Sequence, residues 1–330
     1  MIASDHTTAT EDNSEAREQR QNSRVVSVVT VVMIVVSILP RFSRWAWCFD
    51  VLSGFPLQLA AAGMIWSVGL MRLRRPALAA AMVGVALLSA APSFTWWLQP
   101  ADVCAPAAPH LRIVGYNIWA RNDDRADVLR FLREADPDIA VCCEVRPEMA
   151  RRFSTGLRDL FPHQAHAVRK PGQGIVVLSK HPLLSSEVGE LSDGALVANV
   201  VVSYRGEGIR VLGAHPFSPV SVRRWNIRNR QLSELAALAK RMTEPTIVIG
   251  DFNTTPWSYF FDRFASQSCL RDTQRGIGFA RTWPRGNPFL QMPIDHAFVS
   301  DHWLVKARQA GRATSSDHLP LVVDLVRAGR

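Results

Sequence analysis

The segment TIVIGDFN, residues 246–253, joins an apolar run to a polar ending. The apolar run 246–250 predicts a short buried strand. Asp251 and Asn253 follow it two positions apart, and in extended backbone they would point to the same side. A carboxylate beside an amide can orient a water molecule and donate to an oxygen of a bound group. The segment therefore predicts a strand that ends in a reactive site.

On both sides of this segment, along residues 111–330, short apolar runs alternate with helical patterns. Strands alternate with helices in the first half, while two strands stand close together near residues 195–214. This order predicts a mixed α/β sandwich within one domain of about 220 residues. The expected strands are 111–116, 138–143, 174–179, 195–204, 209–214, 246–250 and 294–299, and the expected helices are 125–135, 147–157 and 222–242.

Polar side chains stand at the ends of most of these strands. Each alone has an ordinary explanation, such as a turn, a helix cap or a strand terminator. Together they suggest a site, because strand ends in a layered α/β domain converge on one rim. The residues are Asn117, Glu144, His215, Asp251, Asn253, Asp295, Asp317 and His318.

The types of residue in this set indicate the chemistry. Carboxylates such as Glu144 and Asp317 are hard oxygen ligands that suit Mg²⁺ or Mn²⁺ better than zinc. Histidine can exchange a proton near neutral pH. A metal-dependent hydrolytic site is the expectation.

Three apolar stretches precede this domain: 25–39, 51–71 and 76–97. A helix needs about 20 apolar residues to cross a bilayer, so the second and third qualify. The first is short, and Pro40-Arg41-Phe42 after it is no small-residue signal-peptide cleavage site. We interpret it as an uncleaved span that borrows flanking residues, which gives three transmembrane helices within residues 25–97. The polar residues 1–24 are expected to form a disordered cytoplasmic tail, and residues 98–110, rich in Ala and Pro, a stiff linker.

Arginine asymmetry predicts the orientation in the cell (inner, cytoplasmic) membrane. The tail and the loop between the second and third stretches carry more arginine than the other connections, which favours the cytoplasm for both. Three crossings then place the catalytic domain, residues 111–330, outside the cytoplasm. The arginines of the two predicted cytoplasmic segments are Arg17, Arg20, Arg24, Arg72, Arg74 and Arg75, against Arg41 and Arg44 in the first loop.

Three motifs together resemble the endonuclease/exonuclease/phosphatase (DNase I-like) superfamily. They are the run IGDFN at 249–253, the run SDHLP at 316–320, and the Asn117 and Glu144 that close the first two strands. Three spans followed by such a domain are similar to the membrane-bound bacterial branch of that superfamily. The resemblance covers about residues 111–326. It implies a four-layer α/β sandwich, one Mg²⁺ and in-line attack by water.

The resemblance also implies roles for individual residues. Glu144 would be the main metal ligand, with Asn117 and Asp317 nearby, and His318 would be the base that Asp295 orients. Asp251 would align the water, Asn253 would stabilise the phosphoryl oxygens, and His215 would contact the scissile phosphate. His296 departs from the superfamily, where an aromatic residue is common, and its role stays open between structure and function.

A basic segment, residues 223–231, opens the helix expected after His215. Its Arg228 and Arg230 could grip a second phosphate or lipid head groups. A solvated basic helix face explains them equally well. No alternation of aromatic and basic residues typical of nucleic-acid binding accompanies them.

Residues 110–330 hold 30 basic and 22 acidic residues, which suits an anionic substrate or an anionic membrane surface. The leading hypothesis is a membrane-anchored Mg²⁺-dependent phosphoesterase or pyrophosphatase that acts on a lipid-linked substrate, because a tethered domain meets lipid head groups at high effective concentration. A membrane-tethered nuclease acting on nucleic acid is the less favoured alternative. A non-catalytic binding module is a third, although a binder has no need of a complete acid–base set.

Overall fold

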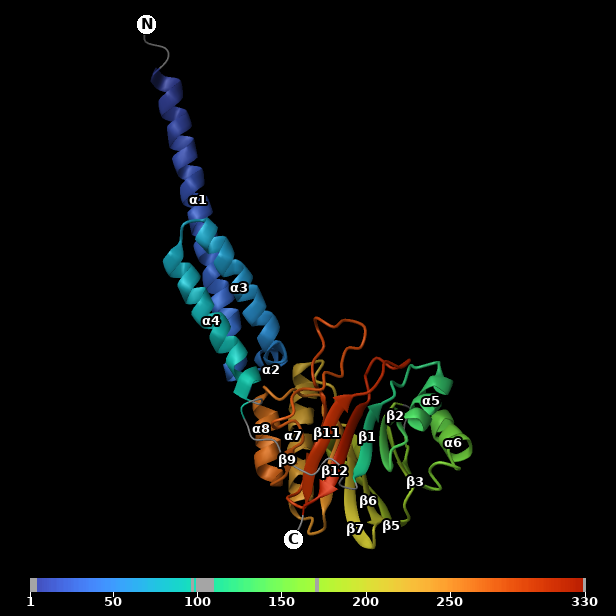
Figure 1. Ribbon diagram of the computed structural model, residues 1–330. Coiled ribbons are helices and arrows are strands. Elements are labelled where there is room, and N and C mark those ends of the chain that lie inside the picture. Colours follow the sequence, from blue (N-terminus) through green and yellow to red (C-terminus); the bar gives the residue numbers. More distant parts are fainter. Residues whose placement is uncertain (1–4, 96–97, 99–109, 170–171, 329–330) are drawn as a thin grey trace.

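The computed structural model describes residues 5–95, 98, 110–169 and 172–328. A bundle of long helices from the N-terminal third stands on one end of an α/β domain (Figure 1). The expected linker, residues 98–110, lies outside the described residues except for its two ends, Leu98 and His110.

Two six-stranded sheets, both mixed, form the centre of the α/β domain. Most neighbours are antiparallel, but β1 with β2 and β7 with β8 are parallel. In order across the first sheet lie β11 (Trp303–Ala310), β12 (Leu321–Arg327), β1 (Leu111–Asn117), β2 (Ile139–Val145), β4 (Gly174–Ser179) and β3 (His163–Ala167). The second has β5 (Leu183–Leu191), β6 (Ala195–Tyr204), β7 (Glu207–Ala214), β8 (Thr246–Asp251), β10 (Asp295–Val299) and β9 (Arg271–Asp272).

The two sheets pack face to face through a core of branched aliphatic side chains, including Ile113, Val141 and Ile249. Glycine allows the closest approach. A Cβ added at Gly213 would stand 2.7 Å from Val141 Cγ1, and one added at Gly115 would stand 2.8 Å from Ile249 Cγ1. Since interiors are close-packed, a side chain at either position would push the sheets apart.

Helices cover the two outer faces. On the first sheet lie α5 (Arg125–Ala135) and α6 (Pro147–Gly156), whose apolar faces join one core cluster with β1 and β2. On the second lie α7 (Val222–Lys240) and α8 (Tyr259–Ser268), with the short turn η2 (Ser192–Gly194) beside α7. Helix, sheet, sheet and helix make four layers, so the predicted four-layer α/β sandwich is confirmed.

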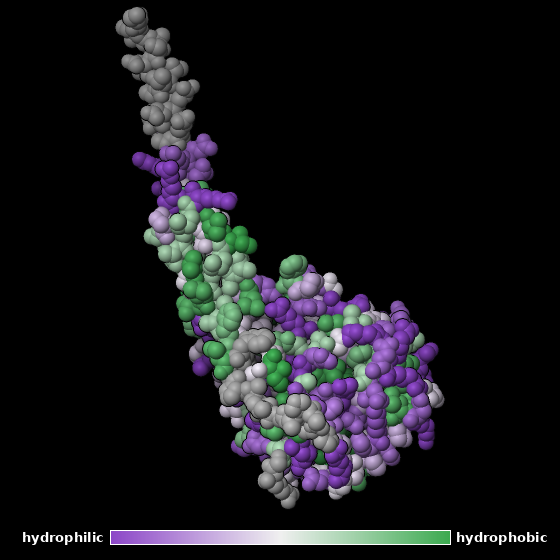
Figure 2. Space-filling view, in the orientation of Figure 1, coloured by the Kyte–Doolittle hydropathy of each residue, from purple (hydrophilic) through white to green (hydrophobic). Residues whose placement is uncertain are grey.

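The N-terminal helices are α1 (Asp5–Ile38), η1 (Leu39–Phe42), α2 (Trp47–Ser53), α3 (Pro56–Arg72) and α4 (Pro76–Thr95). Two stretches, Arg17–Phe42 and Pro76–Phe94, are helical, long and apolar enough to cross a membrane. The pair α2 and α3 qualifies only as one broken span, bent by 80°. The described residues therefore hold two candidate spans, or three if the bent pair is one. Hydrophobic side chains cover the surface of this bundle, whereas the α/β domain is mostly hydrophilic (Figure 2).

Two details of this region differ from the sequence prediction. The tail expected to be disordered is helical from Asp5, because α1 runs on without a break into the first apolar stretch. Residues 5–38 contain no Gly or Pro to stop a helix, and Ala, Glu, Gln and Arg favour it. The second stretch is no single straight helix, because Gly54 and Phe55 separate α2 from α3 just before Pro56, which begins a new helix.

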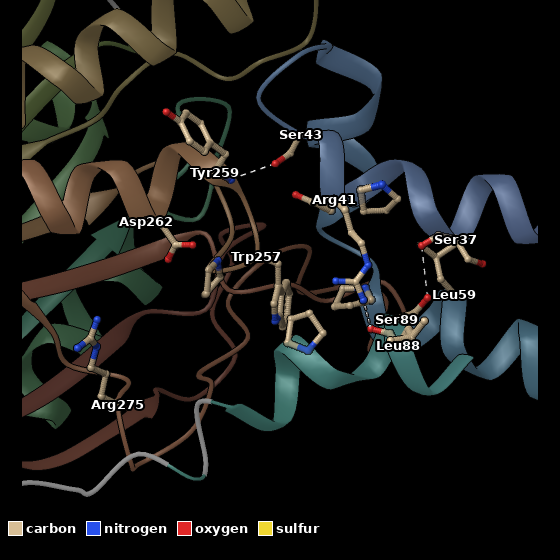
Figure 3. Close-up of a pocket in the computed structure, with 15 residues that line it drawn as sticks. Ser37, Arg41, Ser43, Leu59, Leu88, Ser89, Trp257, Tyr259, Asp262 and Arg275 are labelled. Carbon is tan, nitrogen blue, oxygen red and sulfur yellow. Dashed lines mark hydrogen bonds between the residues drawn. The ribbon is translucent and has the colours of Figure 1, made fainter. Parts of the chain in front are cut away.

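The N-terminal helical part, residues 5–95, which we call the anchor, also contacts the α/β domain directly. The Ser43 hydroxyl accepts a hydrogen bond of 3.1 Å from the backbone N–H of Tyr259, at the start of α8. Arg41 donates to the carbonyl of Leu88 at 2.6 Å and so ties η1 to α4. These residues line a cavity of about 450 Å³ at the junction (Figure 3). The indole of Trp47 in α2 donates to the carbonyl of Pro219. The anchor is therefore packed on the domain that it carries.

Candidate active site

Strand pairing brings the predicted site residues to one rim of the sandwich. Asn117 ends β1 and is in register with Cys143 of the parallel strand β2, so Glu144 follows beside it. Glu144 has a positive φ of 59°, and the pairing of β2 with β4 shifts register at this position. Such a bulge re-aims a side chain. In the second sheet, Asp251 of β8 is directly opposite Asp295 of β10.

Asn117 connects the two sheets. Its side-chain N–H₂ donates to Glu144 Oε1 at 3.0 Å and to Asp251 Oδ2 at 2.9 Å. Its carbonyl oxygen accepts from the backbone N–H of Trp119 at 3.0 Å. Glu144 Oε2 accepts from the N–H of Ala120 at 2.8 Å. The first two carboxylates of the site are thus held in fixed positions by hydrogen bonds.

His215 lies between the same two carboxylates. Its Nε2 is 3.5 Å from Asp251 Oδ2 and 3.9 Å from Glu144 Oε1. Burial acts to lower the pKa of His215, but the Asp251 carboxylate outweighs it, and the pKa is raised overall. Burial in turn acts to raise the pKa of Asp251, yet the bond with His215 and the charge of His318 bring it below its ordinary value. Asp251 is therefore an ionised carboxylate at neutral pH.

Asp295 and His318 form the predicted pair. His318 Nδ1 and Asp295 Oδ2 are 2.8 Å apart, and His318 Nε2 is 3.7 Å from Asp251 Oδ2. Burial alone would lower the pKa of His318, but the facing carboxylates, Asp295 above all, raise it to about 10. Burial also raises the pKa of Asp295. With its pKa at about 10, His318 carries a proton at neutral pH, so both of its ring nitrogens are N–H donors.

Asn253 reaches Asp251 by another route than the sequence suggested. Its φ is 50°, in the left-handed region, so the backbone turns here and is not extended. The Asn253 N–H donates to Asp251 Oδ1 at 2.9 Å, which is the turn that Asp commonly makes with the backbone two residues on. The Asn253 amide donates to the carbonyl of Pro216 at 3.0 Å and stands 3.4 Å from Asp251 Oδ2. The expected adjacency holds, but a turn produces it.

Several oxygens of the site are fit to bind a cation. Among the described residues, one group of carboxylate and imidazole ligands lies close enough to hold a metal: Asp251, Asp295 and His318. The predicted ligands Glu144 and Asp317 are not in this group, and their role, with that of Asn117, stays a prediction. Asp295 Oδ1 and Asp317 Oδ1 are both buried without a hydrogen-bond partner. A buried carboxylate oxygen left unpaired is costly, and hard oxygen donors of this kind suit Mg²⁺ or Mn²⁺.

The contacts of His296 indicate a structural role. It is fully buried, its Nε2 bonds to the carbonyl of Thr254 at 2.8 Å, and its Nδ1 lies 3.2 Å from the Gln274 side-chain nitrogen. Burial lowers the pKa of His296 to about 3. Its ring packs against Phe252 and Phe261 in the core under α8. A neutral histidine therefore fills the space of an aromatic ring.

The two arginines proposed to grip phosphate have other partners. Arg228 is fully buried and donates to Asp50 of α2 and to the carbonyl of Asn253, the latter at 3.0 Å. Arg230 forms an exposed ion pair with Asp193 at 3.0 Å and lines a different cavity from the catalytic residues. Helix α7 turns Arg228 inward toward the anchor and Arg230 outward toward η2. Arg228 lines the same cavity as Glu144 and Asp251, although both its terminal nitrogens have acceptors within the protein. A phosphate grip by these arginines stays a prediction.

Sequence reasoning also missed a residue of the site. The Trp283 indole donates to Asp317 Oδ2 at 3.2 Å. Burial raises the pKa of Asp317, and the bond from Trp283 acts against that rise. Trp283 stands in a loop between β9 and β10 with no recurring pattern around it, and an aromatic residue before Pro284 is no signal for a site.

One cavity of about 870 Å³ contains the site. The predicted residues Glu144, His215, Asp251, Asn253, Asp317 and His318 line it. The other wall belongs to the anchor, with Trp47, Asp50, Val51, Gly54 and Phe55. Helix α2 and the Gly54-Phe55 link that follows it thus form one side of the cavity that holds these residues.

Comparison with known proteins agrees with this arrangement. The model of the Endonuclease/Exonuclease/phosphatase family matches residues 114–318. The chain is 26% identical over 225 residues to the UPF0294 protein VP2298 of Vibrio parahaemolyticus, covering 64% of this chain and 76% of that one.

Solved structures share the fold. An endonuclease/exonuclease/phosphatase from Beutenbergia cavernae matches with a TM-score of 0.56 and 22% identity, over 67% of this chain and 72% of that one. Sphingomyelinase C from Streptomyces griseocarneus matches with a TM-score of 0.52 and 18% identity, over 66% of this chain and 99% of that one. With the family match spanning the rim residues from β1 to His318, the chain belongs to the Endonuclease/Exonuclease/phosphatase family.

Proposed function

We propose that this protein is a membrane-anchored, Mg²⁺- or Mn²⁺-dependent hydrolase that cleaves a phosphate ester or anhydride in a lipid-linked substrate. One observation carries the proposal: a single cavity is lined on one side by the catalytic rim and on the other by the anchor. A substrate with a phosphate joined to a hydrocarbon chain matches both walls. Sphingomyelinase C is a relative in fold whose name refers to a lipid, which supports a lipid-linked substrate here.

The residues of the rim divide the chemistry between them. In this proposal Glu144 and Asp317 would hold the cation, with Asn117 fixing the position of Glu144. The ligand atoms of Asp251, Asp295 and His318 also lie close enough together to share in holding it. When bound, the cation supplies positive charge that stabilises the charge developing on the phosphoryl oxygens and lowers the pKa of His318 beside it. His318 holds the proton that is exchanged at the reacting centre, and Asp295 fixes its ring. Asp251 orients the attacking water.

Apolar side chains on the anchor's wall favour a lipid over a nucleic acid in this proposal. Val51 and Phe55 face the cavity from the anchor, so one end of a bound molecule contacts apolar side chains. The cavity also holds aromatic and basic side chains, among them Trp119, Trp283 and Arg121, on which the bases and phosphates of a nucleic acid would depend. The basic charge of residues 110–330 suits either substrate, and the assay below separates them.

The test uses the full-length protein in detergent with Mg²⁺. Farnesyl pyrophosphate, a longer polyprenyl pyrophosphate, a water-soluble phosphodiester and single- and double-stranded DNA are compared, with Glu144→Gln as the inactive control. Release of phosphate or of a phosphorylated fragment from the polyprenyl substrates, rising with chain length, supports the proposal. Faster cleavage of DNA would establish the nuclease alternative. Binding of the substrates with no turnover in any assay would establish the binding module.

We also propose that the catalytic domain lies outside the cytoplasm. The turn at residues 72–75 lies beside the middle of α1, because Arg75 donates to the hydroxyls of Ser23 and Ser27. The α/β domain is at the opposite end of the bundle (Figure 1). Alkaline phosphatase fused after residue 330 should be active and one inserted at residues 72–75 inactive. The reverse pattern would invert the orientation.

A further inference from the structure

Asp50 is the single acidic residue between positions 19 and 101 of the sequence. It lies in α2, in the apolar part of the chain that we assign to the anchor. A carboxylate in such surroundings is costly unless it is paired and hydrogen-bonded. Its presence there therefore calls for a specific partner.

The partners of Asp50 all come from the α/β domain. Oδ2 accepts from Arg228 and, at 3.0 Å, from the indole of Trp225, both in α7. Oδ1 accepts from the hydroxyl of Ser258, which caps α8. Both carboxylate oxygens are thus satisfied across the junction. The ion pair is almost completely buried, since Asp50 is 7% exposed and Arg228 is 0% exposed.

Arg228 extends this contact to the catalytic rim. While one of its terminal nitrogens donates to Asp50, the other donates to the carbonyl of Asn253 at 3.0 Å. Its guanidinium also stacks over Phe260, 5.5 Å from the ring centroid. Asn253 is the left-handed residue whose N–H holds Asp251. A chain of three contacts therefore runs from the anchor to the carboxylate of the reacting centre.

The geometry explains why the guanidinium needs Asp50. Burial lowers the pKa of Arg228, and the facing Asp50 carboxylate acts against that effect. A planar guanidinium can donate in two directions at once, and its orientation is fixed when both acceptors are in place. With Asp50 removed, the buried cation loses its counter-charge and its hold on the Asn253 carbonyl loosens.

We propose that Asp50 is a positioning residue of the active site: through Arg228 it holds the Asn253 turn, and so the anchor is part of the catalytic site as well as a tether. The effect on turnover rests on the proposed function. The effect on the Asn253 turn does not, and the two are measured separately.

The first arm measures kinetics in the full-length protein with Mg²⁺ and a water-soluble phosphodiester, so that lipid binding does not enter. Asp50→Asn is expected to lower kcat by roughly 10- to 100-fold with KM changed less than about twofold, because a small misplacement of a catalytic group costs about 10²-fold. Arg228→Lys keeps the charge opposite Asp50 but cannot bridge both acceptors, so kcat should fall there too.

The second arm measures hydrogen exchange of backbone amides. In Asp50→Asn, peptides covering residues 252–258 should exchange roughly tenfold faster, which corresponds to about 1.4 kcal/mol of local stability. Peptides from β1 and β2 should not change. The matched control is Asp193→Asn. It removes the exposed ion pair with Arg230, which lies in α7 like Arg228, and should alter neither kcat nor exchange in the Asn253 turn.

The outcomes separate the possibilities. A folded Asp50→Asn variant with unchanged exchange at 252–258 and unchanged kcat would overturn the proposal and leave Asp50 as an anchor contact alone. If Asp50→Asn fails to fold, Arg228→Lys decides by the same two measurements. If the wild-type protein hydrolyses no phosphate ester, the proposed function fails, and the exchange arm still decides whether Asp50 controls the turn.

Discussion

Two regions of the cavity bury carboxylates in opposite ways. At the junction, both oxygens of Asp50 are occupied by donors from α7 and α8. At the rim, Asp295 and Asp317 each keep one buried oxygen without a partner. A satisfied buried charge stabilises one arrangement of the chain, whereas an unsatisfied one is maintained at a cost that a ligand can relieve.

This contrast distinguishes carboxylates that stabilise the fold from carboxylates that can bind a ligand in the same cavity. Both regions have buried charge, histidine or arginine, and short contacts, so burial alone does not distinguish them. The two regions are distinguished by whether a carboxylate oxygen can still accept a hydrogen bond. By this criterion the unpaired oxygens of Asp295 and Asp317 mark the rim as the candidate place for a cation, whereas both oxygens of Glu144 already accept hydrogen bonds. In our proposal the junction supports one side of that rim.

The sharpest test of the rim removes its main predicted ligand. Glu144→Gln should abolish metal-dependent turnover, a loss of roughly 10³-fold or more, because a cation supplies several kcal/mol of charge stabilisation to such a reaction. Since Gln keeps the size of Glu and accepts the same positive φ about as well, the fold should remain. Phosphate release and calorimetric Mg²⁺ binding measure the effect. Full activity with Mg²⁺ in this variant would remove Glu144 from the metal site.

The next test concerns the pair that exchanges protons. His318→Ala should lower kcat by about 10²- to 10⁴-fold and change KM far less, because the proton transfer matters mainly in the transition state. Asp295→Asn should lower kcat by a smaller factor, and the double variant should be little worse than His318→Ala alone, since the pair acts as a unit. Losses that multiply in the double variant would show two independent residues.

Sequence reasoning predicted the layers well and the sheet edges poorly. All seven expected strands are present as β1, β2, β4, β6, β7, β8 and β10, because they are apolar runs that the core buries. No ranges were predicted for the four edge strands, β3, β5, β9 and β11, or for β12, which lies between β11 and β1. β5 is mostly exposed and mixes serine and glutamate with leucine, so no periodic pattern marks it.

For the site, the pattern of polar residues at strand ends carried most of the information. Asn117, Glu144, Asp251 and His318 converge because parallel pairing and a bulge bring strand ends together, which is a regular consequence of topology. The direction in which a helix turns its side chains depends on packing that the sequence does not display. Arg228 therefore read as a surface residue, although Asp50, isolated in an apolar stretch, was a visible signal for a buried partner.

His296 offers a smaller effect that separates it from its neighbour His318. The folded-state pKa of His296 is about 3, below its ordinary 6.5, so between these values the unfolded chain binds a proton that the folded chain does not. Stability should therefore fall by about 1.4 kcal/mol per pH unit as pH drops from 6.5 toward 3. In His296→Gln, which can still donate to the Thr254 carbonyl, this slope should be shallower by up to that amount. Urea unfolding at several pH values measures it, and an identical slope would mean that His296 is not buried neutral.

The smallest expected effect compares the two arginines of α7. Arg230 is paired with Asp193 at the surface, where solvent screens the charges and long side chains lose entropy on pairing. Arg230→Ala should therefore change the free energy of unfolding by less than about 1 kcal/mol and leave kcat and KM near the wild-type values. Arg228→Ala, two positions earlier, removes a buried partner of Asp50, and breaking such a pair typically costs about 3–5 kcal/mol. Both variants replace an arginine of the same helix with alanine, so the changes in helix propensity and in net charge are the same. The difference between their free energies of unfolding therefore reports burial. A rise in KM for a lipid-linked substrate in Arg230→Ala, with stability unchanged, would restore Arg230 as a contact for a phosphate or a head group.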